Sequence, residues 1–489
     1  MKTFEVLDKR RAGILLHPTS LPGANDHGDM GHQAYRFIEF LQACGITVWQ
    51  TLPLGPTHED RSPYQCLSVH AGNPLLISMD WLVDRGWLDK QTVQNNLLDD
   101  TVRALCLDTA FNRFTETKDD YFERYQDFIT SQSYWLDDYS LFIAIRKQQQ
   151  NTSWMHWPAG LRERKPKALE KARKQLQNLI NHIQFEQFIF FQQWSELKQY
   201  AHDHHVLLFG DMPIFVAHDS AEVWAHREFF SVNEHGHPTT VAGVPPDYFS
   251  DNGQRWGNPL YAWDKIQQDK FNWWINRMRT QLTLFDMVRI DHFRGFEANW
   301  EIPVDEETAI NGRWVKTPGR ALLTTLHNKF NPLPIVAEDL GIITDEVNAL
   351  RDEFNIPGMK VLQFAFSGDA HNPYLPHNYT ENCVVYTGTH DNDTTMAWFN
   401  SLPEIDKQYI MDYLHNSDEN MPWQMIRCAM ASTARLCILP MQDILSLAEG
   451  HRMNTPGTQE NNWQWRFNWD QVTGDLTGRL HQLTKLYER

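Results

Sequence analysis

The sequence has no long hydrophobic run and no closely spaced cysteines. These absences disfavour a membrane-spanning, a secreted or a disulfide-rich protein. No stretch approaches the ~18 apolar residues of a membrane-spanning helix, and the first apolar segment, residues 12–16, is too short for a signal peptide. The six cysteines are scattered without a Cys-x-x-Cys pair, as is typical of free thiols in a reducing compartment. We therefore expect a cytoplasmic protein that does not span a membrane.

Basic residues are few as well. The 44 Lys and Arg stand against 62 Asp and Glu, which gives a formal net charge of −18. This charge disfavours nucleic acid or an acidic membrane surface as a partner. The patterns Gly-x-Gly-x-x-Gly and Gly-x4-Gly-Lys-Ser/Thr are absent, and so are Gly-x-Ser-x-Gly and His-Glu-x-x-His. We expect no cofactor and no metal, and two common hydrolase designs are excluded.

The sequence does contain short apolar runs bounded by turn residues. Most are hydrophobic throughout, as strands buried on both faces are. Stretches of helical periodicity lie between most of them, for example at Ala34, Phe37, Ile38 and Leu41. Eight such strands alternating with helices predict an α/β protein with a (β/α)8 TIM barrel. The expected strands are residues 13–16, 46–49, 206–209, 287–290, 335–337, 359–362, 383–386 and 436–439.

The spacing of these strands is uneven. The second and third are separated by far more than the dozen or so residues that a crossover needs. We expect a mostly helical inserted subdomain at about 75–185 within a single catalytic barrel of residues 1–489. A second insertion, at about 217–270 between strands three and four, is rich in Gly, Pro, Asp and aromatics. Long loops at the C-terminal face of a barrel build active sites, so we expect this loop subdomain to cover the cleft.

Three segments carry an acidic residue at the end of an expected strand: VRIDHFRG (288–295), VAEDLG (336–341) and YTGTHDND (386–393). The residues are Asp291, Glu338 and Asp391. Carboxylates flanking one bond are the equipment of glycosidic chemistry. Arg289 and Asp291 share a face of their strand because the side-chain period is two, and a neighbouring guanidinium favours an ionised carboxylate. A half-buried Glu338 near another carboxylate should have a raised pKa.

Each segment also has a structural interpretation. Arg289 and Asp291 suit a buried ion pair, and Glu338 suits the cap of the following helix, although Asp339 is equally placed for that role. His390 and Asp391 suit a loop turn or, with less support, a metal site; as functional groups they suit neighbouring hydroxyls of one sugar. On the residues alone these alternatives stay open.

The three segments together resemble the signature of the 4-α-glucanotransferases, the amylomaltases or disproportionating enzymes of glycoside hydrolase family 77 in the α-amylase superfamily. The resemblance extends nearly end to end, through SPYQ (62–65), AGNP (71–74), GDMPIFVA (210–217), VPPDYFS (244–250), WGNP (256–259) and RMNTPGT (452–458). Asn461 stands where the family pattern has Gly, and Asn tolerates the left-handed conformation better than most residues.

The resemblance implies retaining transfer of a 1,4-α-glucan segment to the 4-hydroxyl of glucose or another glucan, through a covalent glucosyl-enzyme. It implies Asp291 as nucleophile, Glu338 as acid/base and Asp391 as transition-state stabiliser. Further residues are implied to bind or guide substrate: Ser62, Tyr64, Asp211, Asp247, Phe249, Trp256, Asn258, Arg289 and His390.

Partners are then expected to be maltooligosaccharides and other 1,4-α-glucans, bound by a monomer or homodimer. Two rival functions remain: an α-glucan hydrolase with the same machinery, and a glucan-binding protein without catalysis. The second usually loses a carboxylate, whereas all three are present here.

Overall fold

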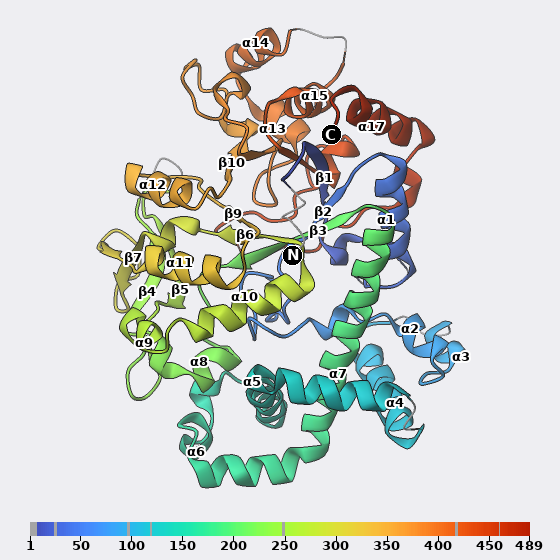
Figure 1. The fold of residues 1–489 in the computed structure, drawn as a ribbon, viewed down its shortest axis with the longest axis vertical. Helices are drawn as coiled ribbons and strands as arrows, with labels where there is room; N and C mark the ends of the chain where they lie inside the picture. The colour runs from blue at the N-terminus through green and yellow to red at the C-terminus, as the bar shows by residue number, and fades with distance from the viewer. Residues whose placement is uncertain are drawn as a thin grey trace.

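Eight parallel strands close into a barrel at the centre of the molecule (Figure 1). The computed structural model describes residues 7–23, 27–94, 98–117, 120–246, 250–415, 419–458 and 460–489. Neighbouring strands follow the chain in the order β1-β2-β3-β6-β9-β10-β11-β12, and β12 pairs with β1. Each of the eight predicted strands is a barrel strand, so the TIM barrel is confirmed. The barrel strands are β1 (Arg11–Leu15), β2 (Val48–Gln50), β3 (Leu207–Pro213), β6 (Met287–Asp291), β9 (Ile335–Ala337), β10 (Gly358–Val361), β11 (Cys383–Tyr386) and β12 (Leu436–Pro440).

The barrel strands are apolar on both faces because both faces are covered. In β11, Val384 and Tyr386 belong to the core inside the barrel, whereas Cys383 and Val385 pack in the layer between strands and helices. This alternation is the period of two expected of a strand. Gly13 of β1 allows β1 and β12 to pack closely, since an added Cβ would lie 2.5 Å from a side-chain atom of the β12 residue across from it.

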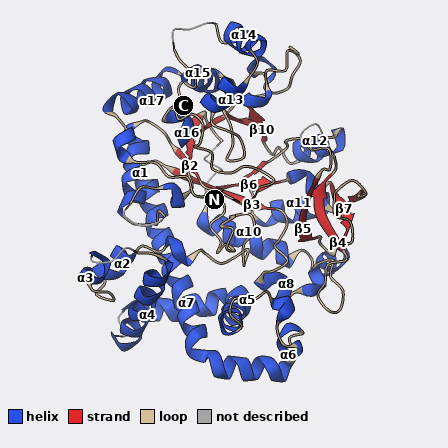
Figure 2. Cartoon of the chain, turned by 180° about the vertical axis from the view of Figure 1, so that it is seen from behind, coloured by secondary structure: helices blue, strands red, loops and turns tan. Residues whose placement is uncertain are grey.

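Helices surround the barrel and also form a separate body beside it (Figures 1 and 2). Helix α1 includes the predicted periodic face, and Phe37, Ile38 and Leu41 are buried there. The helices are α1 (His32–Ala43), α2 (Met79–Asp84), α3 (Lys90–Gln94), α4 (Asp100–Thr117), α5 (Asp120–Gln148), α6 (Ala159–Arg162), α7 (Pro166–Asp203), α8 (Ala221–Ala225), α9 (Trp263–Gln268), α10 (Asn272–Leu284), α11 (Gly319–Lys329), α12 (Asp345–Glu353), α13 (Thr395–Ser401), α14 (Glu404–Tyr413), α15 (Trp423–Ala431), α16 (Met441–Ile444) and α17 (Gly474–Leu486).

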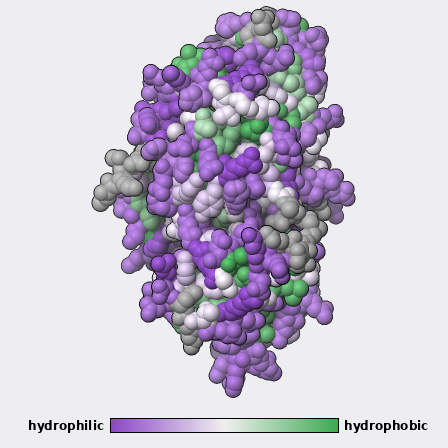
Figure 3. Space-filling view, turned by 90° about the vertical axis from the view of Figure 1, so that its right-hand side faces the viewer, coloured by the Kyte–Doolittle hydropathy of each residue, from purple (hydrophilic) through white to green (hydrophobic). Residues whose placement is uncertain are grey.

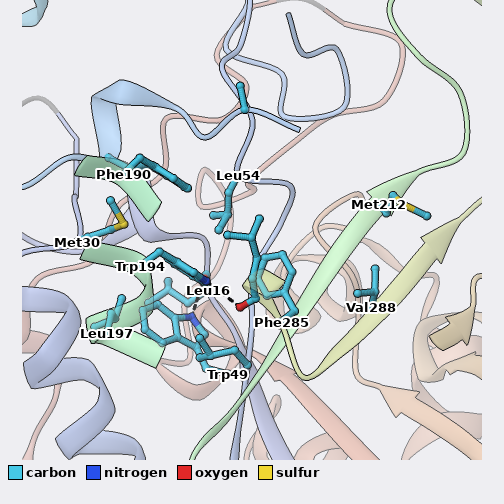
Figure 4. Close-up of a cluster of buried hydrophobic side chains, with 14 of the residues drawn as sticks. Leu16, Met30, Trp49, Leu54, Phe190, Trp194, Leu197, Met212, Phe285 and Val288 are labelled. Carbon is cyan, nitrogen blue, oxygen red and sulfur yellow. Dashed lines mark hydrogen bonds between the residues drawn. The ribbon is translucent and has the colours of Figure 1, made fainter. Parts of the chain in front are cut away.

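The long connection between β2 and β3 is helical, from α2 to α7, and extends below the barrel in Figure 1. Helix α7 begins with Pro166 at its first position, where a missing N–H costs nothing. It then runs back to the barrel, where the Trp194 ring meets Phe285 edge-on at 5.6 Å (Figure 4). The insertion bounds of about 75 and 185 remain predictions, and residue 185 falls within α7.

The segment at 217–270 is more regular than the expected loop subdomain. It contains α8, α9 and two strands, β4 (Thr240–Val244) and β5 (Gln254–Pro259). These pair antiparallel with β7 (Ala298–Pro303) and β8 (Arg313–Lys316) in a second sheet of order β5-β4-β7-β8. This sheet lies beside the barrel (Figure 2). The sequence interpretation missed β7 and β8 entirely.

The large apolar side chains are gathered in the interior. One cluster around Trp49, Trp194 and Phe285 is drawn in Figure 4, where Trp49 Nε1 donates to the Leu16 carbonyl at 2.8 Å. The face in Figure 3 is mainly hydrophilic, with apolar residues in small patches. All six cysteines are free thiols. Within the described ranges, no helix is both long and apolar enough to cross a bilayer.

Candidate active site

The acidic residues singled out from the sequence meet at the carboxyl ends of neighbouring strands. Asp291 is the last residue of β6, and Glu338 directly follows β9. The two strands pair in register through Ile290 and Ala337, and the Glu338 N–H donates to the Ile290 carbonyl at 3.0 Å. The carboxyl end of a parallel barrel is where such enzymes hold their catalytic groups.

Arg289 links the carboxylates of Asp211 and Asp291 from inside the barrel. Its guanidinium lies 2.7 Å from Asp211 of β3 and 2.9 Å from Asp291. Arg289 and Asp211 are 5% and 1% exposed. The sequence prediction that Arg289 and Asp291 share a face is confirmed. The ion pair is buried at Asp211 and opens to solvent at Asp291, whose side chain is 30% exposed, so the structural and functional interpretations of this pair are compatible.

Burial raises the pKa of both carboxyl groups that face each other here. Burial and the Asp291 charge raise the pKa of Glu338 to about 7, against the opposing effect of Arg289. Burial raises the pKa of Asp291 to about 6, although Arg289 lowers it. The expected rise at Glu338 is confirmed. The expectation for Asp291 is corrected: Arg289 favours its ionised form, but burial outweighs it, and Asp211 shares the guanidinium and raises the pKa further.

Backbone donors orient the Glu338 carboxylate. The N–H of His292 donates to Oε2 at 2.7 Å and that of Leu340 to Oε1 at 2.9 Å. His292 adopts φ of 55°, a left-handed conformation that costs free energy in a non-glycine residue and is concentrated at functional sites. The helix-cap alternative for Glu338 is wrong, because α12 begins after its cap residue, Thr344. Asp339 is not that cap either: it pairs with Arg351 and accepts the Met359 N–H.

The His390 and Asp391 pair follows β11. His390 Nε2 lies 3.4 Å from the Asp391 carboxylate, which is itself 46% exposed. The Tyr64 ring stacks on His390 with centroids 5.0 Å apart and planes 15° apart. The Tyr64 hydroxyl donates to Asp211 at 2.7 Å, so the SPYQ segment is fixed to the same network as Arg289. Tyr64, His390 and Asp391 therefore line one side of the carboxylate cluster.

Other predicted substrate-binding residues lie around this network. The Trp256 ring meets His292 edge-on, with centroids 4.8 Å apart. Asn258 exchanges amide hydrogen bonds with Gln65 at 3.1 and 3.4 Å. The Ser62 hydroxyl accepts the Tyr64 N–H at 3.4 Å, which makes Ser62 a support of the SPYQ turn in this structure. The two remaining predicted residues, Asp247 and Phe249, lie outside the described residues.

The sequence interpretation missed three residues of the C-terminal segment that contact this site. Asn454 Nδ2 donates to Asp391 Oδ1 at 2.6 Å, and Arg452 donates to the Asp391 carbonyl at 2.7 Å. The Trp463 ring lies 5.8 Å from Tyr64 and 6.0 Å from His390. The available signal was the RMNTPGT motif, which contains Arg452 and Asn454. The expected left-handed conformation of Asn461 is confirmed, with φ of 60°.

The arrangement has no feature of a metal centre. In the part of the chain that the structure describes, no group of three or more His, Cys, Asp or Glu is placed to hold a metal ion. The absence of a cofactor remains a prediction. What the site provides is two interacting carboxyl groups of raised pKa at neighbouring strand ends, a third carboxylate in the loop after β11, and the aromatic rings of Tyr64 and Trp256 beside them. This set of groups suits the chemistry of glycosyl transfer.

Comparisons with known proteins agree with this chemistry. The model of glycoside hydrolase family 77, described as 4-alpha-glucanotransferase, matches residues 16–472. The chain is 48% identical to a 4-alpha-glucanotransferase of Synechocystis sp., over 99% of each chain. It is 46% identical to one of Thermus thermophilus, over 98% of this chain and 99% of that one. The amylomaltase of Streptococcus agalactiae in complex with acarbose superposes with a TM-score of 0.95 at 37% identity, covering 98% of this chain and 100% of that chain. The chain belongs to the 4-alpha-glucanotransferases of glycoside hydrolase family 77.

Proposed function

We propose that three carboxyl groups divide the work of glucan transfer, with Asp291 as nucleophile, Glu338 as general acid and base, and Asp391 as stabiliser of the transition state. The observation that carries this assignment is the contrast between two facing carboxyl groups. Asp291 pairs with the Arg289 guanidinium at 2.9 Å, which favours its ionised form, whereas Glu338 accepts from two backbone N–H groups and its pKa is raised by burial and by the Asp291 charge. An ionised Asp291 suits the nucleophile, and a Glu338 of raised pKa suits the proton donor.

In the first step, Glu338 gives its proton to the glycosidic oxygen as the bond from that oxygen to the anomeric carbon breaks. Asp291 attacks the same carbon and forms an ester bond to it. The reducing-end fragment leaves with the proton. Asp391, held by Asn454 at 2.6 Å, binds hydroxyls of the reacting sugar and stabilises the positive charge that develops on its ring.

In the second step, the 4-hydroxyl of an acceptor glucan attacks the anomeric carbon. Glu338, now ionised, removes the hydroxyl proton, and the ester bond to Asp291 breaks. The configuration is inverted twice and therefore retained. Retention needs carboxyl groups ~5–5.5 Å apart. Asp291 and Glu338 each follow a residue of the same strand pair, Ile290 and Ala337, and the spacing of adjacent strands, ~4.8 Å, suits that distance.

Transfer outcompetes hydrolysis where water is kept from the glucosyl-enzyme. Trp256 and Phe215 support this in the present site. Both rings lie beside His292, at 4.8 and 6.1 Å between centroids, and His292 follows the nucleophile directly. Segment 217–270, with β4 and β5, is proposed to cover the cleft and guide the glucan. The glucan is proposed to contact Asp247, Phe249 and Asn258 of this segment and Ser62 from elsewhere in the chain.

We also propose the setting of this activity. Donors and acceptors are maltooligosaccharides and longer 1,4-α-glucans, including glycogen- or starch-type chains, handled in the cytoplasm by a monomer or homodimer. Six free thiols support a reducing compartment. A net charge of −18 supports neutral glucans rather than nucleic acids or acidic membranes as partners.

The test is to incubate the pure protein with maltotriose, without cofactor or metal, and to follow chain lengths and total reducing ends. Transfer gives glucose and a ladder of longer glucans at a constant number of reducing ends. Rising reducing ends without longer products would indicate a hydrolase. An unchanged mixture, with longer glucans also unchanged, would indicate a binding protein.

A further inference from the structure

A buried carboxylate lies beneath the loop that carries His390 and Asp391, and none of the steps above uses it. Asp443 is in α16, immediately after the barrel strand β12, and is 1% exposed. The loop leaves the barrel at Thr387, after β11, and ends at Thr395, the first residue of α13. Asp443 therefore belongs to a different strand end from the residues of the loop above it.

Asp443 joins the two ends of this loop. The Thr387 hydroxyl donates to Oδ2 at 2.5 Å. The Thr395 hydroxyl donates to Oδ2 at 2.7 Å, and the Thr395 N–H donates to Oδ1 at 2.7 Å. Thr387 and Thr395 are both 0% exposed. One carboxylate thus fixes the distance between the chain entering and the chain leaving the loop.

The cost of burying this carboxylate argues for a reason beyond packing. Among the described residues, no Lys, Arg or His forms an ion pair with Asp443. A buried charge without a cation is unfavourable unless several donors replace its water. Here the donors are supplied by the active-site loop itself, so the free energy of satisfying Asp443 is available only when the loop has this conformation.

Further hydrogen bonds hold the part of the loop between Thr387 and Thr395. The Asn392 side chain accepts from the N–H and the hydroxyl of Thr389, both at 2.9 Å. Gln363, from the end of β10, donates to the Asp393 carbonyl at 2.9 Å. These contacts stiffen the turn between the two threonines, so a displacement of either end is passed to His390 and Asp391 rather than absorbed.

We infer that Asp443 is a positioning residue of the transfer reaction: it acts through Thr387 and Thr395 to hold His390 and Asp391 against the reacting sugar. This inference rests on the role proposed for Asp391. A group that stabilises a transition state must be placed to within a fraction of an ångström, and a misplacement of ~1 Å costs on the order of 100-fold in rate.

The test compares Asp443→Ala with Asp443→Asn, using maltotriose. Asp443→Ala removes every acceptor, and we expect kcat to fall about 30- to 100-fold with KM changed less than about threefold. Asp443→Asn keeps an oxygen for the Thr395 N–H and offers an amide to the two hydroxyls, which then act as acceptors, so it should recover most of the loss. The matched control is Asp286→Asn. Asp286 lies just before β6, at the opposite end of that strand from the active site, and accepts the Leu208 N–H at 2.8 Å, so this variant should leave kcat unchanged.

A double-mutant cycle separates positioning from stability. In the Asp391→Asn background, Asp443→Ala should cost less than about threefold in kcat, because the group that it positions is already impaired. A loss as large as in the wild type would overturn the inference, as would an unchanged kcat in folded Asp443→Ala. If Asp443→Ala does not fold, the double variant Thr387→Val/Thr395→Val takes its place, with a loss of at least about tenfold expected. Asp391→Asn alone tests the proposed role of Asp391, so failure of that role can be distinguished from failure of the inference about Asp443.

Discussion

Strand β6 has an aspartate at each end, and the two have opposite electrostatic environments. Asp286 lies just before the strand, where burial would raise its pKa, but His202 at 2.9 Å, Lys198 and the Leu208 N–H bring the pKa below its ordinary value. Asp291 ends the strand, where burial and the neighbouring Asp211 raise its pKa to about 6 against Arg289. The same strand therefore has a carboxyl group of lowered pKa before its first residue and a carboxyl group of raised pKa at its last residue.

The difference lies in how cations are shared. At the amino end one carboxylate has two basic side chains to itself. At the carboxyl end Asp211 and Asp291 share Arg289, whereas Glu338 accepts from the backbone N–H groups of His292 and Leu340 and, among the described residues, forms no ion pair. A carboxylate with basic partners of its own stabilises the fold, whereas carboxylates that compete for one cation hold protons near neutral pH. Such a proton is available for catalysis.

The largest effect is expected from removing either facing carboxylate. Asp291→Asn and Glu338→Gln should each lower kcat by at least about 1,000-fold, because one removes the nucleophile and the other the proton donor. Initial rates measure kcat, and thermal melts show whether each variant is folded. Appreciable turnover in a folded variant would remove the corresponding assignment.

The next effect concerns the third carboxylate, Asp391, which lies in the loop after β11. Asp391→Asn should lower kcat about 100-fold and weaken binding as well, because its hydrogen bonds to the sugar strengthen in the transition state. The measurement is kcat and KM with maltotriose. A change in KM at unchanged kcat would reduce Asp391 to an ordinary binding residue.

The barrel and the carboxylate cluster could be predicted from the sequence because both follow from local patterns. Parallel strands covered on both faces are continuous apolar runs, so β11 and β12 are recognisable without their partners. The side-chain period of two places Arg289 beside Asp291. The second sheet was missed because β5 and β8 are polar, and their antiparallel pairing is made only in three dimensions.

The electrostatics and the C-terminal contacts could not be predicted for the same reason. The side-chain period of two predicted that Arg289 lies beside Asp291. It could not predict that Asp211, from a strand distant in the sequence, also pairs with Arg289. Asn454 and Trp463 reach the site from the last part of the chain. The RMNTPGT motif singles out the segment of Asn454, but no local pattern indicates that Asn454 contacts Asp391 or that Trp463 contacts Tyr64. Sharing of one group among distant elements is a property of the fold.

The pH dependence is a smaller effect and tests the carboxyl end directly. Below about pH 6 Asp291 takes up a proton and cannot attack, and above about pH 7 Glu338 loses the proton it must donate. The profile of kcat/KM with maltotriose should therefore be bell-shaped with its maximum between pH 6 and 7, and its limbs belong to the coupled pair. Arg289→Lys should move the acid limb upward, since an ammonium cannot bridge both aspartates. A flat profile from pH 5 to 8 would contradict these assignments.

The smallest effect on activity is expected at the amino end of β6. Asp286→Asn removes the charge that pairs with His202 and Lys198 and should cost about 1–3 kcal/mol of unfolding free energy at pH 7, with kcat unchanged. Because the pKa of Asp286 is lowered in the folded protein, its contribution is fully present above its unfolded value of ~3.9 and is lost as the pH falls through the folded value. The difference between wild type and variant in urea midpoint should therefore narrow below about pH 4. A loss of kcat in Asp286→Asn would mean that the amino end of the strand also controls catalysis, and that the two ends of β6 do not divide stability from chemistry.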